Sequence, residues 1–270
     1  MFDGLRIAAV LPAFNEEVFI AWAIGSLPTE IFDDVIVVDD ASSDHTNARA
    51  VEAGASLVVR HAENCGVGAT LVTGFRAAME RGNDVVVVIP GDGQADFDAL
   101  VPMLEKIRAG AGLVIADRVS GRDPTEFGMP RYRVVGSQIL AVMTWVVTGL
   151  YVADPQSGYT AIRREALDRI PLDRLYPRWG IHNDVLSYCA LAHVPVATVL
   201  AKPVYSTPDG TRITSHIKLW DLIPRHMKVF ARILVRRISS TLSRVSGRSS
   251  VVPAWPLATA SSVQGTGLEE

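Results

Sequence analysis

The chain has 270 residues, which suits one large domain or one domain with an appendage. Apolar residues make up 49% of it, enough for a full hydrophobic core, and the net charge of −3 provides no basic excess that would favour nucleic acid. Two cysteines, Cys65 and Cys189, are too few for a disulfide framework or a metal cluster, so we expect a protein of the reducing cytoplasm.

The first half of the chain alternates short apolar runs with stretches of helical spacing. The runs are rich in β-branched residues and predict buried strands at 5–11, 35–38, 57–60, 85–89 and 113–116. Helices are predicted between them at 17–26, 46–53, 64–81 and 97–109. This alternation predicts an α/β fold, with a mostly parallel central sheet flanked by helices.

The second half is less regular. A polar, mobile loop is expected at 119–133, and the uncharged stretch at 134–153 predicts a buried or membrane-facing helix. That stretch is long enough to span a bilayer. We expect no span, because polar residues interrupt it and motifs assigned to one site lie on both sides of it. A turn at 154–159, strands at 160–163 and 194–200, and a helix at 180–192 complete the predicted fold.

Residues 215–245 carry apolar side chains at helical spacing, with arginine and lysine between them and one acid, Asp221. A basic amphipathic helix is typical of elements that lie on an anionic membrane surface. The alternative is a helix packed on the sheet with a solvated basic face. Pro224 is expected to kink or divide this helix. We therefore predict a main domain at 1–212, a basic helical appendage at 213–245 and a disordered tail at 246–270.

Acidic side chains follow three of the predicted strands. Glu16 follows the first strand, Asp39 and Asp40 end the second, and Asp92 follows the central one. The carboxyl ends of parallel strands meet at one edge of the sheet, where open α/β folds bind ligands. An acidic cluster on a tight turn suits a hard divalent cation bound through carboxylates and substrate phosphates. The alternative for each residue is a solvated turn or a helix cap.

Five motifs follow one another along the chain: LPAFNEE at 11–17, VVDDASSDHT at 37–46, NCGVG at 64–68, GDGQ at 91–94 and DPQSGY at 154–159. Their order and spacing resemble the family 2 inverting glycosyltransferases of GT-A fold. The last motif is similar to the branch that includes dolichol-phosphate mannosyltransferase and bacterial polyprenyl-phosphate sugar transferases. The resemblance covers 5–205. It implies a GT-A fold with a Rossmann-like nucleotide-binding half, followed by C-terminal amphipathic helices.

The resemblance implies a hexosyltransferase that moves a sugar from a UDP- or GDP-sugar to a polyprenyl phosphate with inversion. Glu16 would accept hydrogen bonds from the ribose, and Asp39 or Asp40 would accept one from the ring N–H of uracil or guanine. The glycines at 66 and 68 would let the backbone approach the nucleotide at a helix start, where the dipole favours anions. The implied nucleotide-binding residues are Pro12, Phe14, Glu16, Asp39, Asp40, Asn64, Gly66, Gly68 and Asp92.

The metal motif departs from the common Asp-x-Asp-x-Gln pattern, because Pro90 takes the place of the first Asp. Asp92 and Gln94 remain as implied metal ligands, and Asp96 lies two residues on. Mg²⁺ or Mn²⁺ held by Asp92, the diphosphate and water would stabilise the leaving diphosphate. The departure also leaves open a non-catalytic nucleotide-sugar-binding protein.

The acceptor phosphate is implied to bind Arg118 and Arg133, with Arg131 as an alternative, because guanidinium groups bind phosphate bidentately. Asp184 lies where many relatives carry a general base. A phosphate monoester has a second pKa of about 6 and needs no base, so Asp184 would then orient the acceptor. With an alcohol acceptor it would act as the base. Asp154 is a further catalytic candidate, whose alternative role is a turn ahead of a proline.

The implied partners are the nucleotide-diphosphate sugar, the polyprenyl phosphate and a membrane surface, with no nucleic acid. A homo-oligomer stays open, as do the sugar, the base and the lipid length. We expect a cytoplasmic protein that is peripheral at the inner face of the cell membrane, brought there by the apolar segments 134–152 and 217–242. The runner-up is the same fold acting on a soluble or glycan hydroxyl.

Overall fold

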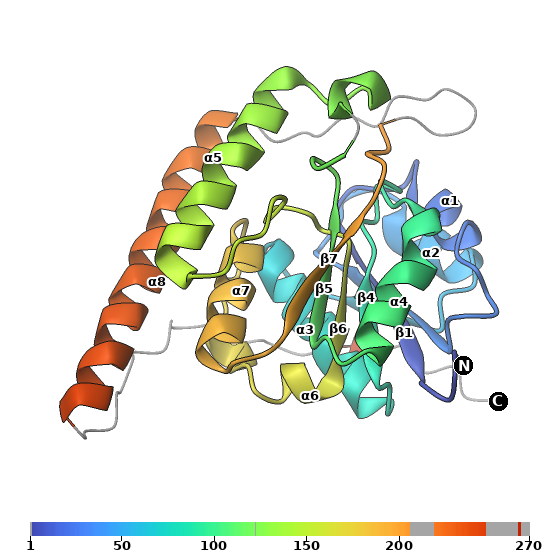
Figure 1. Ribbon diagram of the computed structural model, residues 1–270. Coiled ribbons are helices and arrows are strands. Elements are labelled where there is room, and N and C mark those ends of the chain that lie inside the picture. Colours follow the sequence, from blue (N-terminus) through green and yellow to red (C-terminus); the bar gives the residue numbers. More distant parts are fainter. Residues whose placement is uncertain (1, 122, 206–218, 247–263, 266–270) are drawn as a thin grey trace.

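The computed structural model describes residues 2–121, 123–205, 219–246 and 264–265, and these form one sheet with helices around it (Figure 1). The strand order is β7-β5-β6-β4-β1-β2-β3-β8. The strands are β1 (Ile7–Ala13), β2 (Asp34–Asp39), β3 (Leu57–Arg60), β4 (Val85–Val88), β5 (Leu113–Asp117), β6 (Thr160–Arg163), β7 (Val196–Leu200) and β8 (Gln264–Gly265).

The strands that the sequence predicted as a parallel set are parallel. β1 pairs in parallel with β2 and β4, β2 pairs with β3, and β5 pairs with β7. The exceptions are β6, which is antiparallel to both β4 and β5, and β8, which is antiparallel to β3. The predicted mostly parallel α/β sheet is therefore confirmed, with one antiparallel strand inserted between β4 and β5.

Helices cover both faces of the sheet. They are α1 (Ile20–Gly25), α2 (Thr46–Glu52), α3 (Val67–Glu80), α4 (Leu100–Arg108), α5 (Arg131–Thr148), α6 (Arg164–Leu167), α7 (Ile181–Leu191) and α8 (Leu219–Ser246). Short 3₁₀ helices lie at η1 (Phe97–Ala99), η2 (Pro124–Phe127) and η3 (Leu172–Arg174). α1, α2 and α4 contribute to one core cluster, and α3, α6 and α7 to the other.

β4 is the central strand that its run of valines predicted. Val85 and Val87 lie in one core cluster, while Val86 and Val88 lie in the other. All four side chains are almost completely buried. Burial of a valine contributes about 1.5–3 kcal/mol, so a strand buried on both faces anchors the two halves of the core to each other.

α5, α7 and α8 form a layer beyond the sheet, in which α5 and α8 lie side by side (Figure 1). Val229, Phe230 and Ile233 of α8 are buried against the apolar side of α5. α8 continues through Pro224, so the proline does not divide the helix.

The structure refines two of the sequence predictions, and two others fall on residues that it does not describe. The expected loop at 119–133 contains η2, and α5 begins at Arg131, which brings two arginines into its first turn. Residues 206–218 and most of the predicted tail at 246–270 lie outside the described residues. In the part of the chain that is described, no helix combines the length and the apolarity that a membrane crossing requires.

Candidate active site

The loops that follow β1, β2 and β4 meet at the carboxyl edge of the sheet. The backbone N–H of Asn15 donates to the hydroxyl of Ser42 at 2.9 Å, and that of Glu16 donates to the hydroxyl of Thr46 at 2.8 Å. The loop after β4 lies against the same region, because a Cβ atom on Gly91 would stand 2.7 Å from the carbonyl oxygen of Pro12. Three motifs far apart in sequence thus share one edge.

The turn that carries Asp92 is tightly packed. Gly93 has φ +78°, and a Cβ atom there would stand 1.9 Å from the ring of Trp22. Together with the close approach at Gly91, this requires glycine on both sides of Asp92. The backbone N–H of Gln94 donates to Asp92 at 3.0 Å, so the turn sets the direction of the carboxylate.

Glu16 and Asp92 form a pair of carboxylates that disfavour each other's charge. Burial, together with the negative charges of Asp92 and Asp44, raises the pKa of Glu16 to about 7. Burial also raises the pKa of Asp92, against the lowering effects of the Gln94 N–H and two arginines. The amide nitrogen of Gln94 is buried without a hydrogen-bond partner among the described residues. The carboxylates of Glu16 and Asp92 are oxygen donors of the kind that bind a divalent metal ion.

The two acids that end β2 have different surroundings. The carboxylate of Asp40 accepts hydrogen bonds from the backbone N–H groups of Cys65 and Gly66, at 2.8 and 2.7 Å, and from His61 Nδ1 at 2.8 Å. Asp40, His61 and Cys65 bring potential metal ligands within 4.8 Å of one another. However, these atoms of Asp40 and His61 already take part in hydrogen bonds. Through its bonds to Cys65 and Gly66, Asp40 fixes the backbone that leads into α3.

Asp39 keeps one acceptor oxygen. Its Oδ1 accepts from the backbone N–H of Ser42 at 2.9 Å, whereas its Oδ2 has no hydrogen bond among the described residues and lies 3.5 Å from Arg60 Nε. Of the two predicted base-binding acids, Asp39 is therefore the one with an oxygen that can accept a further hydrogen bond. Arg60 was missed in the sequence, although its position as the last residue of β3 places it at the same edge. Phe14, also predicted at the nucleoside, is 47% exposed there.

The glycines that open α3 accommodate the protein's own backbone. A Cβ atom on Gly68 would stand 2.1 Å from the carbonyl oxygen of Tyr176, and one on Gly66, with φ +95°, would stand 2.7 Å from that of Pro177. Asn64 Oδ1 accepts from Arg178 at 3.3 Å. Packing against 176–178 accounts for both glycines, and the contact of Asn64, Gly66 and Gly68 with a nucleotide stays a prediction.

Arg118, at the end of β5, is aimed by a buried carboxylate. Its Nε and Nη2 donate to Asp154 at 2.7 and 3.2 Å, and Asp154 is fully buried. Burial would lower the pKa of Arg118, but the negative charge of Asp154 and the hydrogen bond that Asp154 accepts outweigh it and raise the pKa, so the guanidinium stays charged. Ser137 of α5 also donates to Asp154, at 3.2 Å. In this structure, Asp154 therefore orients the guanidinium of Arg118.

Arg133 approaches the same place from the first turn of α5. Its Nη1 donates to the hydroxyl of Tyr205 at 3.3 Å, and its guanidinium lies 5.7 Å from the centre of that ring. The positive charges of Arg118 and Arg133 both lower the pKa of Asp92, which places them near the acidic turn. Arg131 is exposed in the same helical turn. Tyr205 was not among the residues predicted from the sequence.

Residues 8–171 match the sequence profile described as glycosyl transferase family 2. The chain belongs to this family. It is 28% identical to the UDP-N-acetylglucosamine–dolichyl-phosphate N-acetylglucosaminyltransferase of Methanococcus voltae, across 82% of this chain and 95% of the relative. It is 31% identical to the undecaprenyl-phosphate mannosyltransferase of Micrococcus luteus, across 85% of this chain and 99% of the relative.

Among solved structures, this family 2 chain is similar to glucosyl-3-phosphoglycerate synthase from Mycobacterium tuberculosis. The complex with phosphoglyceric acid matches with a TM-score of 0.61 and 28% identity, across 87% of this chain and 80% of that one. The complex with Mn²⁺, UDP and phosphoglyceric acid matches with a TM-score of 0.59 and 26% identity, across 87% and 78%. The predicted GT-A fold, the family and the glycosyltransferase activity are confirmed.

One predicted catalytic residue of the family 2 chain lies away from this edge. Asp184 is fully buried, accepts a hydrogen bond from the backbone N–H of Tyr176 at 2.9 Å, and lies 2.8 Å from Arg236 Nη2 of α8. Arg232 stands 3.9 Å from it on the same helix. In this arrangement Asp184 joins α7 to α8, and its role as a general base stays a prediction.

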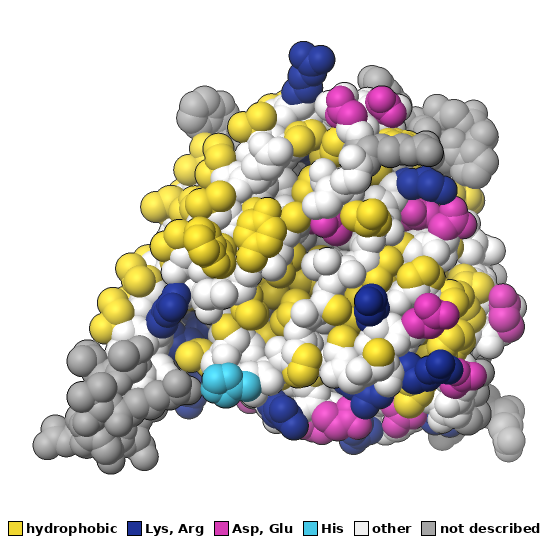
Figure 2. Space-filling view, in the orientation of Figure 1, with side chains coloured by type: hydrophobic (Ala, Val, Ile, Leu, Met, Phe, Trp, Pro, Cys, Tyr) yellow, Lys and Arg dark blue, Asp and Glu magenta, His cyan; other side chains and the backbone are white. Residues whose placement is uncertain are grey.

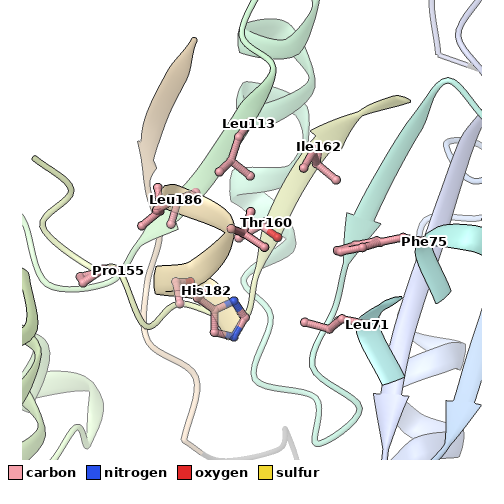
Figure 3. A pocket seen from close by; sticks show the side chains of 11 residues that line it. Leu71, Phe75, Leu113, Pro155, Thr160, Ile162, His182 and Leu186 are labelled. Atoms are coloured by element: carbon pink, nitrogen blue, oxygen red, sulfur yellow. The ribbon is translucent and has the colours of Figure 1, made fainter. Parts of the chain in front are cut away.

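His182, two residues earlier in α7, turns toward the site instead. Burial, together with the positive charge of Arg118, lowers its pKa to about 4. Figure 3 shows His182 opposite Leu71 at a small cavity between α3, α7 and the sheet. The cavity measures about 20 Å³, which is room for a single water and not for a sugar.

Proposed function

We propose that this family 2 glycosyltransferase moves a sugar from a UDP- or GDP-sugar to a polyprenyl phosphate, with inversion at the anomeric carbon. The observation that carries the proposal is that Arg118, Arg133 and Glu16 all lie close enough to Asp92 for their charges to interact with it. Two cations face two carboxylates at one sheet edge. This suits a reaction that must bring the anionic donor and the anionic acceptor together.

The donor would bind on the carboxylate side. Asp39 has an acceptor oxygen for the ring N–H of uracil or guanine, and Glu16 has one for the ribose hydroxyls. Asp92, with Gln94 beside it, would hold a divalent cation, Mg²⁺ or Mn²⁺, which supplies positive charge to the leaving diphosphate. The M. tuberculosis synthase, whose structures include Mn²⁺ or Mg²⁺ together with UDP, supports this assignment.

The acceptor would bind on the arginine side. Arg118 and Arg133 offer planar donors that fit a phosphate, and the Tyr205 hydroxyl accepts from Arg133 and can donate its own proton onward. A lipid phosphate is already ionised near neutral pH, so it can attack the anomeric carbon in line without a base. The burial of Asp184 in an ion pair with Arg236 supports an acceptor of this kind.

The lipid acceptor requires a membrane contact, and α5 and α8 offer one. Side chains about half exposed follow one another at helical spacing: Val135, Ile139, Val142 and Val146 on α5, and Ile223, Met227, Leu234 and Ile238 on α8. Figure 2 shows hydrophobic side chains gathered along the side of the molecule that these helices form. We propose that this face, with the basic residues of α8, lies on the inner face of the cell membrane.

The domain limits fit the same proposal. The main domain would extend over 1–212, and the helix at 213–245 would be the interfacial element appended to it. One side of α8 packs on α5 and α7, while another side is exposed and apolar.

A second candidate is transfer to a soluble, phosphate-bearing hydroxyl compound. The similarity to glucosyl-3-phosphoglycerate synthase favours it, since that protein was solved with phosphoglyceric acid. The test is incubation of the full chain with labelled UDP- and GDP-sugars, Mn²⁺, and either a short polyprenyl phosphate, the matching polyprenol or 3-phosphoglycerate. We expect product with the polyprenyl phosphate alone. No lipid product from any donor would overturn the proposal, and product with 3-phosphoglycerate would favour the second candidate.

A further inference from the structure

A chain of hydrogen bonds runs from α8 through the 154–159 loop and α7 to α5. His226 Nε2 lies 2.9 Å from Gln156 Oε1, and Gln156 Nε2 donates to Asn183 Oδ1 at 2.5 Å. Asn183 Nδ2 donates to the Thr144 hydroxyl at 2.6 Å, and that hydroxyl donates to the carbonyl of Leu140 at 2.6 Å. Asn183 and Thr144 are fully buried, and His226 is 6% exposed.

The direction of every link follows from its last member. Thr144 gives its only proton to a backbone carbonyl, so its oxygen must accept from the Asn183 amide. Asn183 therefore turns its oxygen to Gln156, and Gln156 turns its own oxygen to α8. His226 must then carry its proton on Nε2 and donate it. Each group both accepts and donates onward, an arrangement in which the bonds strengthen one another.

This chain of hydrogen bonds holds the 154–159 loop, and the same loop orients Arg118 through Asp154. Gln156 lies two residues after Asp154, whose carboxylate grips the guanidinium through two hydrogen bonds. Figure 3 shows Pro155, between them, near His182 of α7. No hydrogen bond from η2 or the body of the sheet holds Gln156 among the described residues. The position of Asp154, and with it the direction of Arg118, therefore depends on the hydrogen bonds of Gln156 to α7 and α8 as well as on Ser137 of α5.

We propose that His226 and Gln156 are positioning residues for the acceptor phosphate, and that α8 is in this way a working part of the acceptor site. The inference rests on the proposed function, because it assumes that Arg118 binds the acceptor phosphate. α8 is also held to α7, by the ion pair of Arg236 with Asp184, which keeps His226 beside Gln156. A helix that meets the membrane thus also sets the geometry of the phosphate-binding arginine.

The test compares three variants of the full chain. His226→Phe keeps a ring of similar size and removes the donor, whereas His226→Gln keeps a donor that can reach Gln156. Val235→Ala, at a side chain of α8 that is 59% exposed, is the matched control. Transfer is measured with a short polyprenyl phosphate in detergent, so that membrane binding does not enter. Amide hydrogen exchange of the 152–159 segment is measured on the same samples, with 85–88 as reference.

We expect His226→Phe to lower kcat/KM for the acceptor by about tenfold, since a buried carbonyl oxygen loses its donor, while nucleotide affinity stays unchanged. Exchange at 152–159 should rise by a similar factor and that at 85–88 should not. His226→Gln should recover most of both, and Val235→Ala should match the wild type.

Two results would overturn the inference: unchanged exchange at 152–159 in His226→Phe, or an equal loss of nucleotide affinity and acceptor kcat/KM with a lower melting temperature. If the wild type transfers to no polyprenyl phosphate, the proposed function fails. The exchange measurement does not use an acceptor, so it still decides whether His226 holds the loop.

Discussion

On the donor side of the sheet edge, carboxylates are held mainly by backbone N–H groups, whereas on the acceptor side charged and amide side chains hold one another. Asp39, Asp40 and Asp92 accept from the backbone at Ser42, at Cys65 and Gly66, and at Gln94. By contrast, Arg118 is fixed by the side chain of Asp154. The two sides therefore depend on different features of the sequence.

The difference lies in what each arrangement demands of its neighbours. A carboxylate held by a turn needs a tight backbone, and glycines must stand where any side chain would clash, as at Gly91 and Gly93. A side-chain network needs only that partners from several helices reach one another. Its members are brought together by packing, and a change in one helix reaches the others. Changes on the acceptor side should therefore affect stability and acceptor use more than nucleotide binding.

The largest effect should come from breaking the ion pair between α7 and α8. Asp184→Asn leaves Arg236, 4% exposed, buried without its countercharge, and we expect a loss of about 3–5 kcal/mol in the free energy of unfolding. Urea denaturation measures this. The kcat of the protein that remains folded should change by only a few fold. A loss of kcat beyond a hundredfold at unchanged stability would instead identify Asp184 as the base.

Asp92→Asn tests the donor side. The amide keeps the turn hydrogen bond but removes the charge that would hold the cation. We expect kcat to fall by about a hundredfold to a thousandfold, the range typical of removing one group that stabilises the transition-state charge, with little change in melting temperature. Asp98→Asn is the matched control, because Asp98 is exposed on η1 and pairs with Lys202. Equal activity in both variants would place the metal elsewhere.

The choice between Arg133 and Arg131 can be settled with a pair of variants. Arg133 lies against Tyr205 and affects the pKa of Asp92, whereas Arg131 is exposed two residues earlier, on the opposite side of the helical turn. Arg133→Gln should lower kcat/KM for the acceptor about tenfold to a hundredfold, because a hydrogen bond to a charged group contributes about 1.5–3 kcal/mol. Arg131→Gln should have little effect. Steady-state kinetics with varied acceptor would show the reverse if the alternative were right.

The contrast also explains what the sequence could predict. The five motifs located the donor edge, and the strands at 57–60 and 160–163 were predicted with the bounds that the structure has. The antiparallel direction of β6 was not predicted, because the direction of a strand depends on where the preceding segment returns it. The start of α5 was placed at 134 because the apolar run begins there, while the helix itself includes two arginines before it.

Partners on the acceptor side lie too far apart in sequence for local patterns to identify them. Gln156 and His226 are separated by 70 positions, and Arg118 and Asp154 by 36. Asp184 was recognised as unusual, yet its partner Arg236 stood within a run of basic residues that predicted only a charged helix face. Tyr205 and Arg60 carried no motif. For Arg60, its position at the end of a predicted strand was the only available signal, whereas Tyr205 lies five residues beyond the strand predicted at 194–200 and had none.

His182 provides a pH test of the acceptor side. Its folded pKa of about 4 lies below the unfolded value of about 6.5, so protons bind the unfolded chain more readily. The stability that His182 contributes is complete above the unfolded pKa and is lost as the pH falls toward the folded pKa. Between pH 7 and pH 5 we expect a loss of about 1–2 kcal/mol. His182→Asn should lose less over this interval than the wild type, and exposed His193→Asn should behave like the wild type.

The smallest effect concerns the backbone of the donor side. Ala41, directly after the two β2 acids, has φ +60°, a conformation that costs an alanine roughly 1–2 kcal/mol. Ala41→Gly removes that strain but adds freedom to the unfolded chain, so we expect a net gain in the free energy of unfolding of less than about 1 kcal/mol. Ala53→Gly, at a helix end with φ −76°, should destabilise by about 0.5–1 kcal/mol instead. If the two variants shift the urea midpoint in the same direction, the β1 and β2 loops are not the strained, backbone-held element that the donor side requires.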